Sequence, residues 1–286
     1  MNELLQHIVN GLIAGSAYGL LALAMTMIYG ILTVPDFGMG AIYALGAFIS
    51  FYIIAWLGPG YYFLSLVPVI LMAGIIGIFS ERIVFRPLQN APHATGFIAA
   101  LGLYSIFEGG WNVWFGPDWR NIVSPYNDMI ILLGPISLTL QRLLILIVCL
   151  IFALGTYLFI YRTMTGKKIR ACSENRDVAR ILGVDTRRMT SLTFFVSYAL
   201  VATGGALVAP TALVGSSMGM TPIVKAFIVV ALGGLGSVTG AIVGGLVLGI
   251  GENLGAAYIS SQYKDLFAFG IFLAVLLLRP QGLFRR

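Results

Sequence analysis

Side chains able to carry out chemistry are few in this chain of 286 residues. The two histidines, His7 near the outer start of the chain and His93 in an inner loop, are not expected to reach Ser237, so this serine has no evident general base and intramembrane proteolysis is disfavoured. The P-loop patterns GxxxxGKS and GxxxxGKT are absent, and no His, Cys, Asp or Glu cluster has the spacing of metal ligands. Cys149 and Cys172 are expected to be free thiols. We therefore expect no active site, metal or cofactor in the chain itself.

Glu108 and Asn112 are polar residues at one end of an apolar segment. Four residues apart, they share a face of a helix and could meet an ammonium group at the mouth of a cavity. Lys225 begins another apolar segment and could attract a carboxylate. Ionisable residues inside a membrane are functional candidates by default, although interfacial ion pairs or helix anchors explain these equally well. Glu252 and Asp265 stand at segment ends and are interpreted as interfacial.

The elements that hold these side chains are expected to cross a membrane. Hydrophobic residues make up 59% of the chain and charged residues 10%, against about 25% charged residues in a soluble domain. This composition excludes an ordinary soluble enzyme, a disordered chain and a disulfide-rich secreted domain. We expect an all-α, polytopic membrane protein with a single domain over residues 1–286 and about eight spans of about 20 residues. The apolar segments are 8–31, 40–57, 61–80, 95–115, 140–161, 189–210, 223–250 and 264–278.

Positive charge is concentrated near residues 82–86, in the loop 162–188 and at Arg279, Arg285 and Arg286. The positive-inside rule places these three regions in the cytoplasm, so that the N-terminus lies outside and the C-terminus inside. The segment 223–250 must then begin and end outside. It is interrupted at Gly233, Gly234, Gly236 and Ser237, which predicts a re-entrant hairpin or two half-helices. Such a break is a candidate part of a transport pathway, and tight helix packing is its alternative role.

The loop 162–188 carries eight basic residues against three acidic ones. Within it, the pattern predicts a helix over 174–182 with Ser173 as the N-terminal cap, Glu174 and Asp177 in the first turn, and Gly183 at its end. A helix of about nine residues is not stable alone in water. Its apolar face is made up of Val178, Ile181 and Leu182.

We expect this amphipathic helix to dock on the chain's own helix ends, on the lipid surface or on a partner protein. A defined apolar face flanked by acidic residues favours a protein partner over lipid. Setting the topology of the chain is the alternative role of its basic residues.

Several motifs together resemble the permease subunits of branched-chain amino acid ABC importers, over nearly the whole chain, and the H-type subunit more than the longer M-type. In the loop the matching residues are Thr165-Gly166, Arg170-Ala171, Asn175, Ala179 and Leu182-Gly183-Val184. Elsewhere they are Asn10-Gly11-Leu12, Gly15-Ser16-Ala17-Tyr18, Ile28-Tyr29-Gly30, Glu81-Arg82, Arg86-Pro87, Lys225-Ala226-Phe227, Leu232-Gly233-Gly234-Leu235-Gly236-Ser237, Gly240-Ala241, Tyr263-Lys264-Asp265 and Arg279-Pro280 with Gly282.

The resemblance implies a bacterial inner-membrane permease subunit for leucine, isoleucine and valine, without enzymatic activity of its own. It implies a second permease subunit, two ATP-binding subunits that hold ATP and Mg²⁺, and an extracytoplasmic binding protein that delivers cargo. Membrane lipid is the other expected contact, and nucleic acid is not expected. The helix 174–182 would be the coupling helix, seated on an ATP-binding subunit. The candidate coupling residues are Arg170, Ala171, Glu174, Asn175, Val178, Ala179, Ile181, Leu182 and Gly183.

The candidate pathway residues are aromatic, polar and glycine residues in the apolar segments and at their breaks. They are Phe37, Gly40, Tyr43, Glu108, Asn112, Gly233, Gly234, Gly236 and Ser237. One departure affects the cargo: Asp36 stands where the family has a neutral amide, and Met39 where it has a histidine. The same machinery carrying urea, a short amide or another amino acid is therefore the nearest alternative. An ATP-independent carrier or channel is less favoured, because no series of intramembrane carboxylates is evident. A membrane protein without transport activity that uses 162–188 for docking is a further alternative.

Overall fold

The computed structural model describes residues 2–89, 91–122, 124, 126–133, 136–259, 263–279 and 282. Pro280, Arg285 and Arg286, which enter the sequence argument, lie outside these residues. Each of the eight expected apolar segments contains helix. The α-helices are α1 (Asn2–Leu32), α2 (Met39–Leu57), α3 (Tyr62–Ser80), α4 (His93–Phe115), α5 (Leu140–Arg162), α6 (Met164–Glu174), α7 (Arg176–Ile181), α8 (Thr186–Val208), α9 (Met220–Gly233), α10 (Val238–Tyr258) and α11 (Lys264–Leu278).

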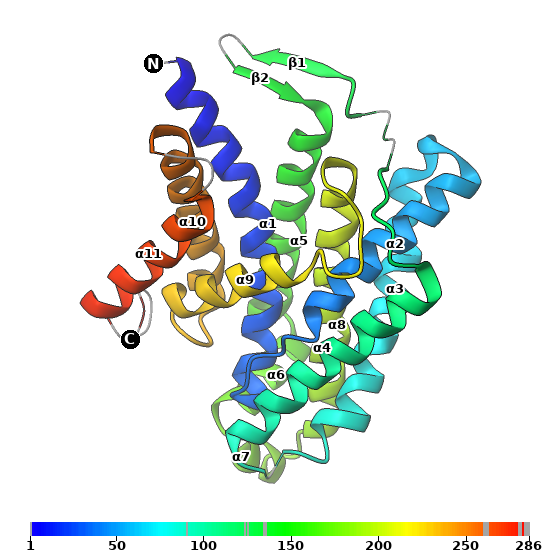
Figure 1. The fold of residues 1–286 in the computed structure, drawn as a ribbon. Helices are drawn as coiled ribbons and strands as arrows, with labels where there is room; N and C mark the ends of the chain where they lie inside the picture. Colours follow the sequence, from blue (N-terminus) through cyan, green and yellow to red (C-terminus); the bar gives the residue numbers. More distant parts are fainter. Residues whose placement is uncertain are drawn as a thin grey trace.

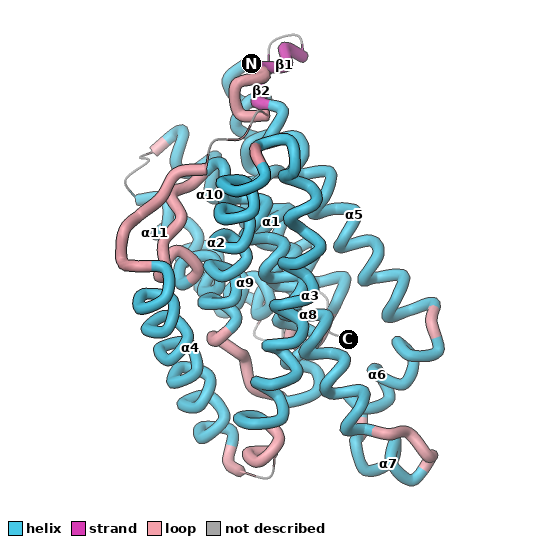
Figure 2. Tube along the Cα trace, turned by 90° about the vertical axis from the view of Figure 1, so that its right-hand side faces the viewer, coloured by secondary structure: helices cyan, strands magenta, loops and turns pink. Residues whose placement is uncertain are grey.

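Six spans of the described chain are long and apolar enough to cross a membrane, and they contain α1, α2, α3, α5, α8 and α10. Figure 1 shows α1 running from the end of the molecule that holds the N-terminus to the opposite end, where α6 and α7 lie. The basic residues of 162–188 are therefore gathered at the end opposite the N-terminus. Figure 2 shows α4 and α5 on opposite flanks of the bundle, with α1, α2 and α8 between them.

A two-stranded antiparallel hairpin stands at the N-terminal end, formed by β1 (Ile130–Leu133) and β2 (Ile136–Thr139). The loop between the fourth and fifth apolar segments was not predicted to contain strands, so this hairpin is an exception to the all-α expectation. The side chain of Gln6 on α1 binds β2, since its Nε2 donates to the backbone carbonyl of Ser137 at 2.8 Å. The hairpin is thereby tied to the start of α1.

The helices α1 and α10 form an antiparallel pair whose backbones touch at glycines. A Cβ atom on Gly11 would lie 2.6 Å from Cα of Ile250, and one on Gly15 would lie 2.8 Å from Cα of Leu246. Small residues at such positions let helix backbones approach closely. The glycine-rich sequence of both helices thus serves close packing.

The segment 223–250 is broken as predicted, into α9 and α10. Gly234 and Gly236 adopt φ of +92° and +89°, which residues with a side chain rarely adopt. Ser237 then caps α10, because its hydroxyl accepts from the backbone N–H of Gly240 at 3.0 Å. Figure 1 shows α9 lying across the direction of α1 and α8. The break thus turns the chain from this crosswise helix into α10.

Candidate functional site

The loop 162–188 contains two helices, α6 and α7, where the sequence predicted one helix over 174–182. Asn175 separates them and caps α7, because its Oδ1 accepts from the backbone N–H groups of Asp177 at 3.1 Å and Val178 at 3.0 Å. The prediction of Ser173 as the cap is wrong: its hydroxyl donates to the carbonyl of Arg170 within α6. Glu174 is accordingly the last residue of α6 and not part of the first turn of α7.

Gly183 ends α7, as its sequence position predicted. It adopts φ of +80°. The backbone N–H of Gly183 donates to the carbonyl of Arg180, and that of Val184 donates to the carbonyl of Ala179, both at 3.0 Å. This pair of bonds is the Schellman arrangement that satisfies the last carbonyls of a helix. The two ends of α7 are thus fixed by local bonds.

The apolar face of α7 is uncovered by the described part of the chain. Val178, Ile181 and Leu182 are 49%, 83% and 74% exposed. On the other side of the helix, Ala179 is buried. Docking on the chain's own helix ends, one of the expected possibilities, is therefore not what this face does. An exposed apolar cluster at the end of a short helix is typical of a docking surface for another molecule.

The remaining candidate coupling residues lie on α6. Arg170 lies over the ring of Tyr161, with its guanidinium carbon 4.8 Å from the ring centroid. Ala171 is partly buried. Burial raises the pKa of the neighbouring Cys172 thiol, and the charge of Arg176 opposes this rise. Burial lowers the pKa of the half-buried Arg176 guanidinium. The first residue of α7 therefore reaches back into the body of the protein.

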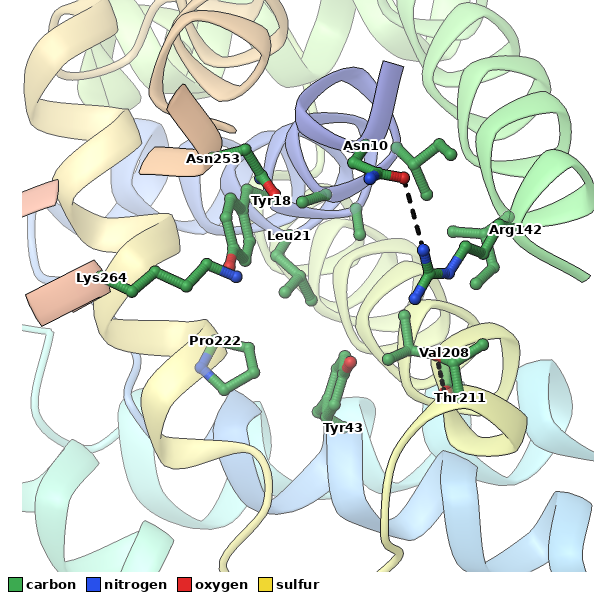
Figure 3. A pocket seen from close by; sticks show the side chains of 14 residues that line it. Asn10, Tyr18, Leu21, Tyr43, Arg142, Val208, Thr211, Pro222, Asn253 and Lys264 are labelled. Atoms are coloured by element: carbon green, nitrogen blue, oxygen red, sulfur yellow. Dashed lines mark hydrogen bonds between the residues drawn. The ribbon is translucent and has the colours of Figure 1, made fainter. Parts of the chain in front are cut away.

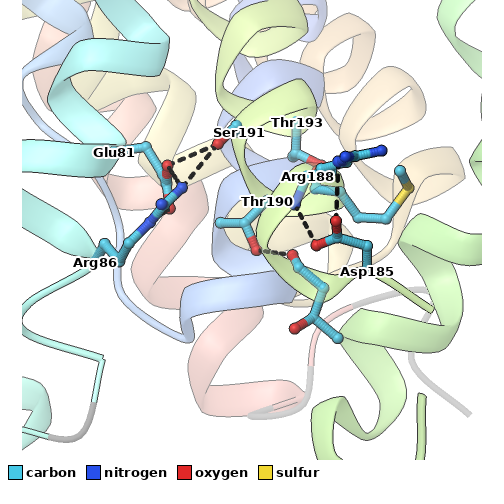
Figure 4. A network of polar contacts seen from close by, with 9 residues as sticks. Glu81, Arg86, Asp185, Arg188, Thr190, Ser191 and Thr193 are labelled. Carbon is cyan, nitrogen blue, oxygen red and sulfur yellow. Dashed lines mark hydrogen bonds and ion pairs between the residues drawn. The ribbon is translucent and has the colours of Figure 1, made fainter. Parts of the chain in front are cut away.

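A buried polar network lies at the same end of the bundle (Figure 4). Glu81, which is fully buried at the end of α3, accepts from Nη2 of Arg86 at 2.6 Å and from the hydroxyl of Ser191 on α8 at 2.8 Å. Arg86 Nη2 also donates to Ser191 at 3.0 Å. The sequence identified Glu81 and Arg86 only as motif residues. Their pairing with α8 comes from the tertiary structure.

At the N-terminal end, a cavity of about 410 Å³ lies between α1, α2, α5, α8, α9, α10 and α11 (Figure 3). Its lining contains two basic side chains, Arg142 and Lys264, and two tyrosines, Tyr18 and Tyr43. The other lining residues are Asn10, Ile13, Ala14, Ala17, Leu21, Ile145, Val208, Thr211, Pro222 and Asn253. The volume lies within the usual range for small-molecule sites.

Tyr43 is the candidate pathway residue that lines this cavity. Phe37 instead packs on the rings of Phe97 and Phe227, with centroid distances of 5.6 and 5.7 Å. Gly40 lies against the backbone of Gly219, where α9 begins. Both residues therefore pack the middle of the bundle.

The other candidate pathway residues lie away from the cavity. Asn112 accepts from the hydroxyl of Ser216 at 2.7 Å, which joins α4 to the loop before α9. Glu108 is half-buried on α4. Gly233 approaches the backbone of Gly240, which is the tight packing named as the alternative role of the break. Gly234, Gly236 and Ser237 complete the turn and do not line the cavity.

Next to the cavity lies an ionic cluster that the sequence did not predict. Lys225, only 7% exposed, has its Nζ 2.6 Å from Glu252 Oε1 and 2.7 Å from Asp265 Oδ1. Lys264 Nζ lies 3.4 Å from the same Glu252 oxygen. Glu252, which the sequence placed at a segment end, is fully buried against neighbouring helices within α10. The hydroxyl of Tyr18 on α1 accepts from Lys225 at 3.3 Å, so the cluster connects four helices.

Asp36, the departure from the family pattern, is fully buried between α1 and α2. One carboxylate oxygen accepts from the backbone N–H of Gly38 at 2.9 Å, and the other accepts from the hydroxyl of Tyr198 at 2.7 Å. The residue therefore ties the chain before α2 to α8. Met39, at the histidine position, is also fully buried. Neither side chain lines the cavity at the N-terminal end.

Within the residues described, no three His, Cys, Asp or Glu side chains are grouped in a way that could hold a metal ion. Cys149 and Cys172 are both buried and free, as predicted. The site thus consists of an exposed docking face at one end of the bundle and a cavity with basic and apolar walls at the other.

Residues 7–276 match the family described as "Branched-chain amino acid transport system / permease component". The permease protein LivH of the high-affinity branched-chain amino acid transport system of Escherichia coli K12 is 34% identical over 99% of this chain and 96% of its own length. The corresponding protein BraD of Pseudomonas aeruginosa is 32% identical over the same shares.

Two further matches are more distant. The permease protein LivM of Escherichia coli K12 is 25% identical over 93% of this chain and 67% of its own length. A chain of the solved structure "PsaBC from Streptococcus pneumoniae in complex with Fab" is 14% identical, with a TM-score of 0.50 over 95% of this chain and 91% of that chain. The second match is a similarity of fold alone. From the family match over nearly its whole length, the chain belongs to the permease components of branched-chain amino acid transport systems.

Proposed function

We propose that this permease component pairs with a second, M-type permease subunit in a bacterial inner membrane, and that together they import leucine, isoleucine and valine. The similarity to LivM supports this pairing, because two subunits of one fold can enclose a pathway between them. The N-terminus lies outside and the α7 end lies in the cytoplasm. The basic residues at the α7 end support this orientation.

Energy for import enters through α7. Two ATP-binding subunits bind ATP and Mg²⁺, and each permease presents its coupling helix to one of them. The single observation that carries this proposal is the uncovered face of Val178, Ile181 and Leu182 at the basic end of the bundle. The capped ends of α7 keep this face in a fixed conformation, so that a movement of the partner is passed to α8 and the body of the protein.

The pathway runs along the N-terminal cavity, with Tyr43 on its wall, and then past Phe37 and Gly40. Gly233, Gly234, Gly236 and Ser237 allow α9 to move against α10, and Glu108 and Asn112 act at the outer end. An extracytoplasmic binding protein delivers the cargo. The aliphatic side chains in the cavity lining, such as Ile13, Leu21 and Val208, support an aliphatic cargo over urea or a short amide. Since Asp36 is satisfied by Gly38 and Tyr198, we expect Asp36→Asn to leave the cargo preference unchanged.

The first test is purification of the tagged chain from native membranes, followed by reconstitution of the complex in liposomes with its binding protein. We expect ATP-binding subunits and a second permease to co-purify, and leucine, isoleucine and valine to be imported only with ATP. Transport by this chain alone without ATP would establish a carrier or channel instead. Import of urea in place of leucine would overturn the assignment of branched-chain amino acids as the cargo.

The coupling role is tested by Ile181→Glu, since this side chain is 83% exposed and its replacement leaves the folded chain intact. We expect binding-protein-stimulated ATP hydrolysis to fall at least about tenfold, because a charge in an apolar contact is costly to bury. Leu213→Glu, at a 57% exposed position in the loop after α8, is the matched control and keeps this activity. Unchanged hydrolysis in Ile181→Glu would contradict coupling through α7.

A further inference from the structure

We propose that Arg142 receives the carboxylate of the amino acid in the N-terminal cavity, while the aliphatic walls of this cavity hold the side chain of the cargo. The proposal rests on the proposed function, to which it adds a defined binding site. Arg142 is in the first turn of α5 and was not among the candidate residues from the sequence.

The charge balance around the cavity singles out Arg142. Lys225 and Lys264 lie on one side, and their charges are matched by Glu252 and Asp265. Figure 3 shows Arg142 on the opposite side of the cavity from Lys264. Its partner there is the neutral side chain of Asn10, whose Oδ1 accepts from Nη1 at 3.3 Å. No acidic side chain pairs with Arg142 in the part of the chain that the structure describes.

A guanidinium without a counterion beside a cavity attracts an anionic group. Arginine offers several N–H donors in a fixed planar arrangement that fits the two oxygens of a carboxylate. Arg142 is exposed at the edge of the cavity, and its single hydrogen bond within the described residues, to Asn10, leaves its other donors available. The chemical class expected at this position is therefore a carboxylate.

Part of the cavity wall is aliphatic. This part is formed by Ile13 and Leu21 of α1, Ile145 of α5, Val208 of α8 and Pro222 of α9, and polar side chains such as Thr211 and Asn253 complete the wall. A branched aliphatic side chain removes apolar surface from water there, whereas a small polar solute such as urea does not. Arg142 matches the carboxylate of an aliphatic amino acid, and the aliphatic part of the wall matches its side chain. The two features together therefore fit this class of cargo.

Tyr43 supplies a third contact. Its ring is buried, and Figure 3 shows its oxygen pointing into the cavity between Arg142 and Lys264. This hydroxyl forms no hydrogen bond with any residue in the described ranges. It is therefore free to accept a hydrogen bond from the ammonium group of the cargo, while the carboxylate lies on Arg142.

The test measures leucine import and ATP hydrolysis together in the reconstituted complex. With Arg142→Gln, leucine released from the binding protein is held less well and returns to the outside. We expect the number of leucine molecules imported per ATP to fall about tenfold or more, the loss typical of a hydrogen bond to a charged group. Arg142→Lys keeps the charge and restores part of this ratio. Asn10→Ala removes only the hydrogen bond between Asn10 and Arg142, and it lowers the number of leucine molecules imported per ATP less than Arg142→Gln does.

If Arg142 has a purely structural role, ATP hydrolysis and leucine import fall in parallel in Arg142→Gln, and the number of leucine molecules imported per ATP stays unchanged. That result, or a normal ratio in Arg142→Gln, overturns the proposal. Failure of the wild-type complex to import leucine with ATP would instead overturn the proposed function, so the two outcomes are distinguishable.

An independent measurement probes the charge of the cavity without any cargo. Thr211→Cys places a thiol on its wall, and both native cysteines are buried, so that background labelling is low. We expect an anionic methanethiosulfonate to react faster than a cationic one of similar size. Arg142→Gln in the same background reduces this preference at least about threefold, as expected for the loss of one nearby charge. An unchanged preference would show that Arg142 does not set the potential of the cavity.

Discussion

Replacing Lys225 by methionine removes the centre of the buried ionic cluster and keeps a side chain of similar length. Glu252 is then left fully buried, with the half-exposed Lys264 at 3.4 Å as its remaining cation. Its other oxygen, Oε2, already has no hydrogen-bond partner within the described residues. Removing one partner of a buried ion pair costs about 3–5 kcal/mol, because a charge stays buried without compensation. We expect the lower half of this range, since Lys264 can move closer.

The assay is the apparent Tm of the purified complex in detergent. At about 2–4 °C per kcal/mol, the expected decrease for Lys225→Met is about 6–16 °C. Lys264→Met is the matched control: its ammonium is partly exposed and more distant, so its removal lowers the Tm by no more than about 4 °C. The double variant Lys225→Met with Glu252→Leu removes both charges and is expected to recover most of the loss.

Two results would refute this reasoning. If Lys225→Met and Lys264→Met lower the Tm equally, burial of the cluster does not determine the cost. If the losses of Lys225→Met and Glu252→Leu simply add in the double variant, the two charges do not stabilise each other.

Three further predictions concern other parts of the bundle. Gly205→Ala places a Cβ inside the backbone of α2 and is expected to prevent stable folding. Gly204→Ala is expected to be tolerated, because the nearest atom to its new Cβ would be 3.6 Å away. Expression and gel filtration of both variants measure the difference. Asn175→Ala removes the cap of α7 and is expected to destabilise this helix by about 1 kcal/mol, so that limited proteolysis cuts the loop faster. Ser173→Ala leaves this cap in place and is expected to leave the rate of proteolysis unchanged. Burial raises the pKa of the Cys172 thiol, so we expect this thiol to need a higher pH than the thiol of glutathione to react with maleimide. Equal reaction rates of the two thiols at neutral pH would contradict this.

Much of the fold was predictable because the length of an apolar run in a membrane nearly fixes the helix that it forms. Each expected apolar segment contains helix, and the break at Gly233–Ser237 was predicted because glycines allow the positive φ found there. The helix α7 was predicted with the wrong start. Ser173 and Asn175 are both good caps, and local sequence did not show that the Ser173 hydroxyl would bind within α6.

The sequence by itself determined the class of protein, the helical segments, the basic end of the bundle and the apolar face of α7. These depend on local composition and periodicity. The tertiary structure decided which polar side chains meet. Lys225 binds Glu252, which is 27 residues away, and Arg142 binds Asn10, which is 132 residues away. Such partners depend on which helix faces touch, and these faces are set by glycine contacts such as that of α1 with α10, which no local pattern specifies.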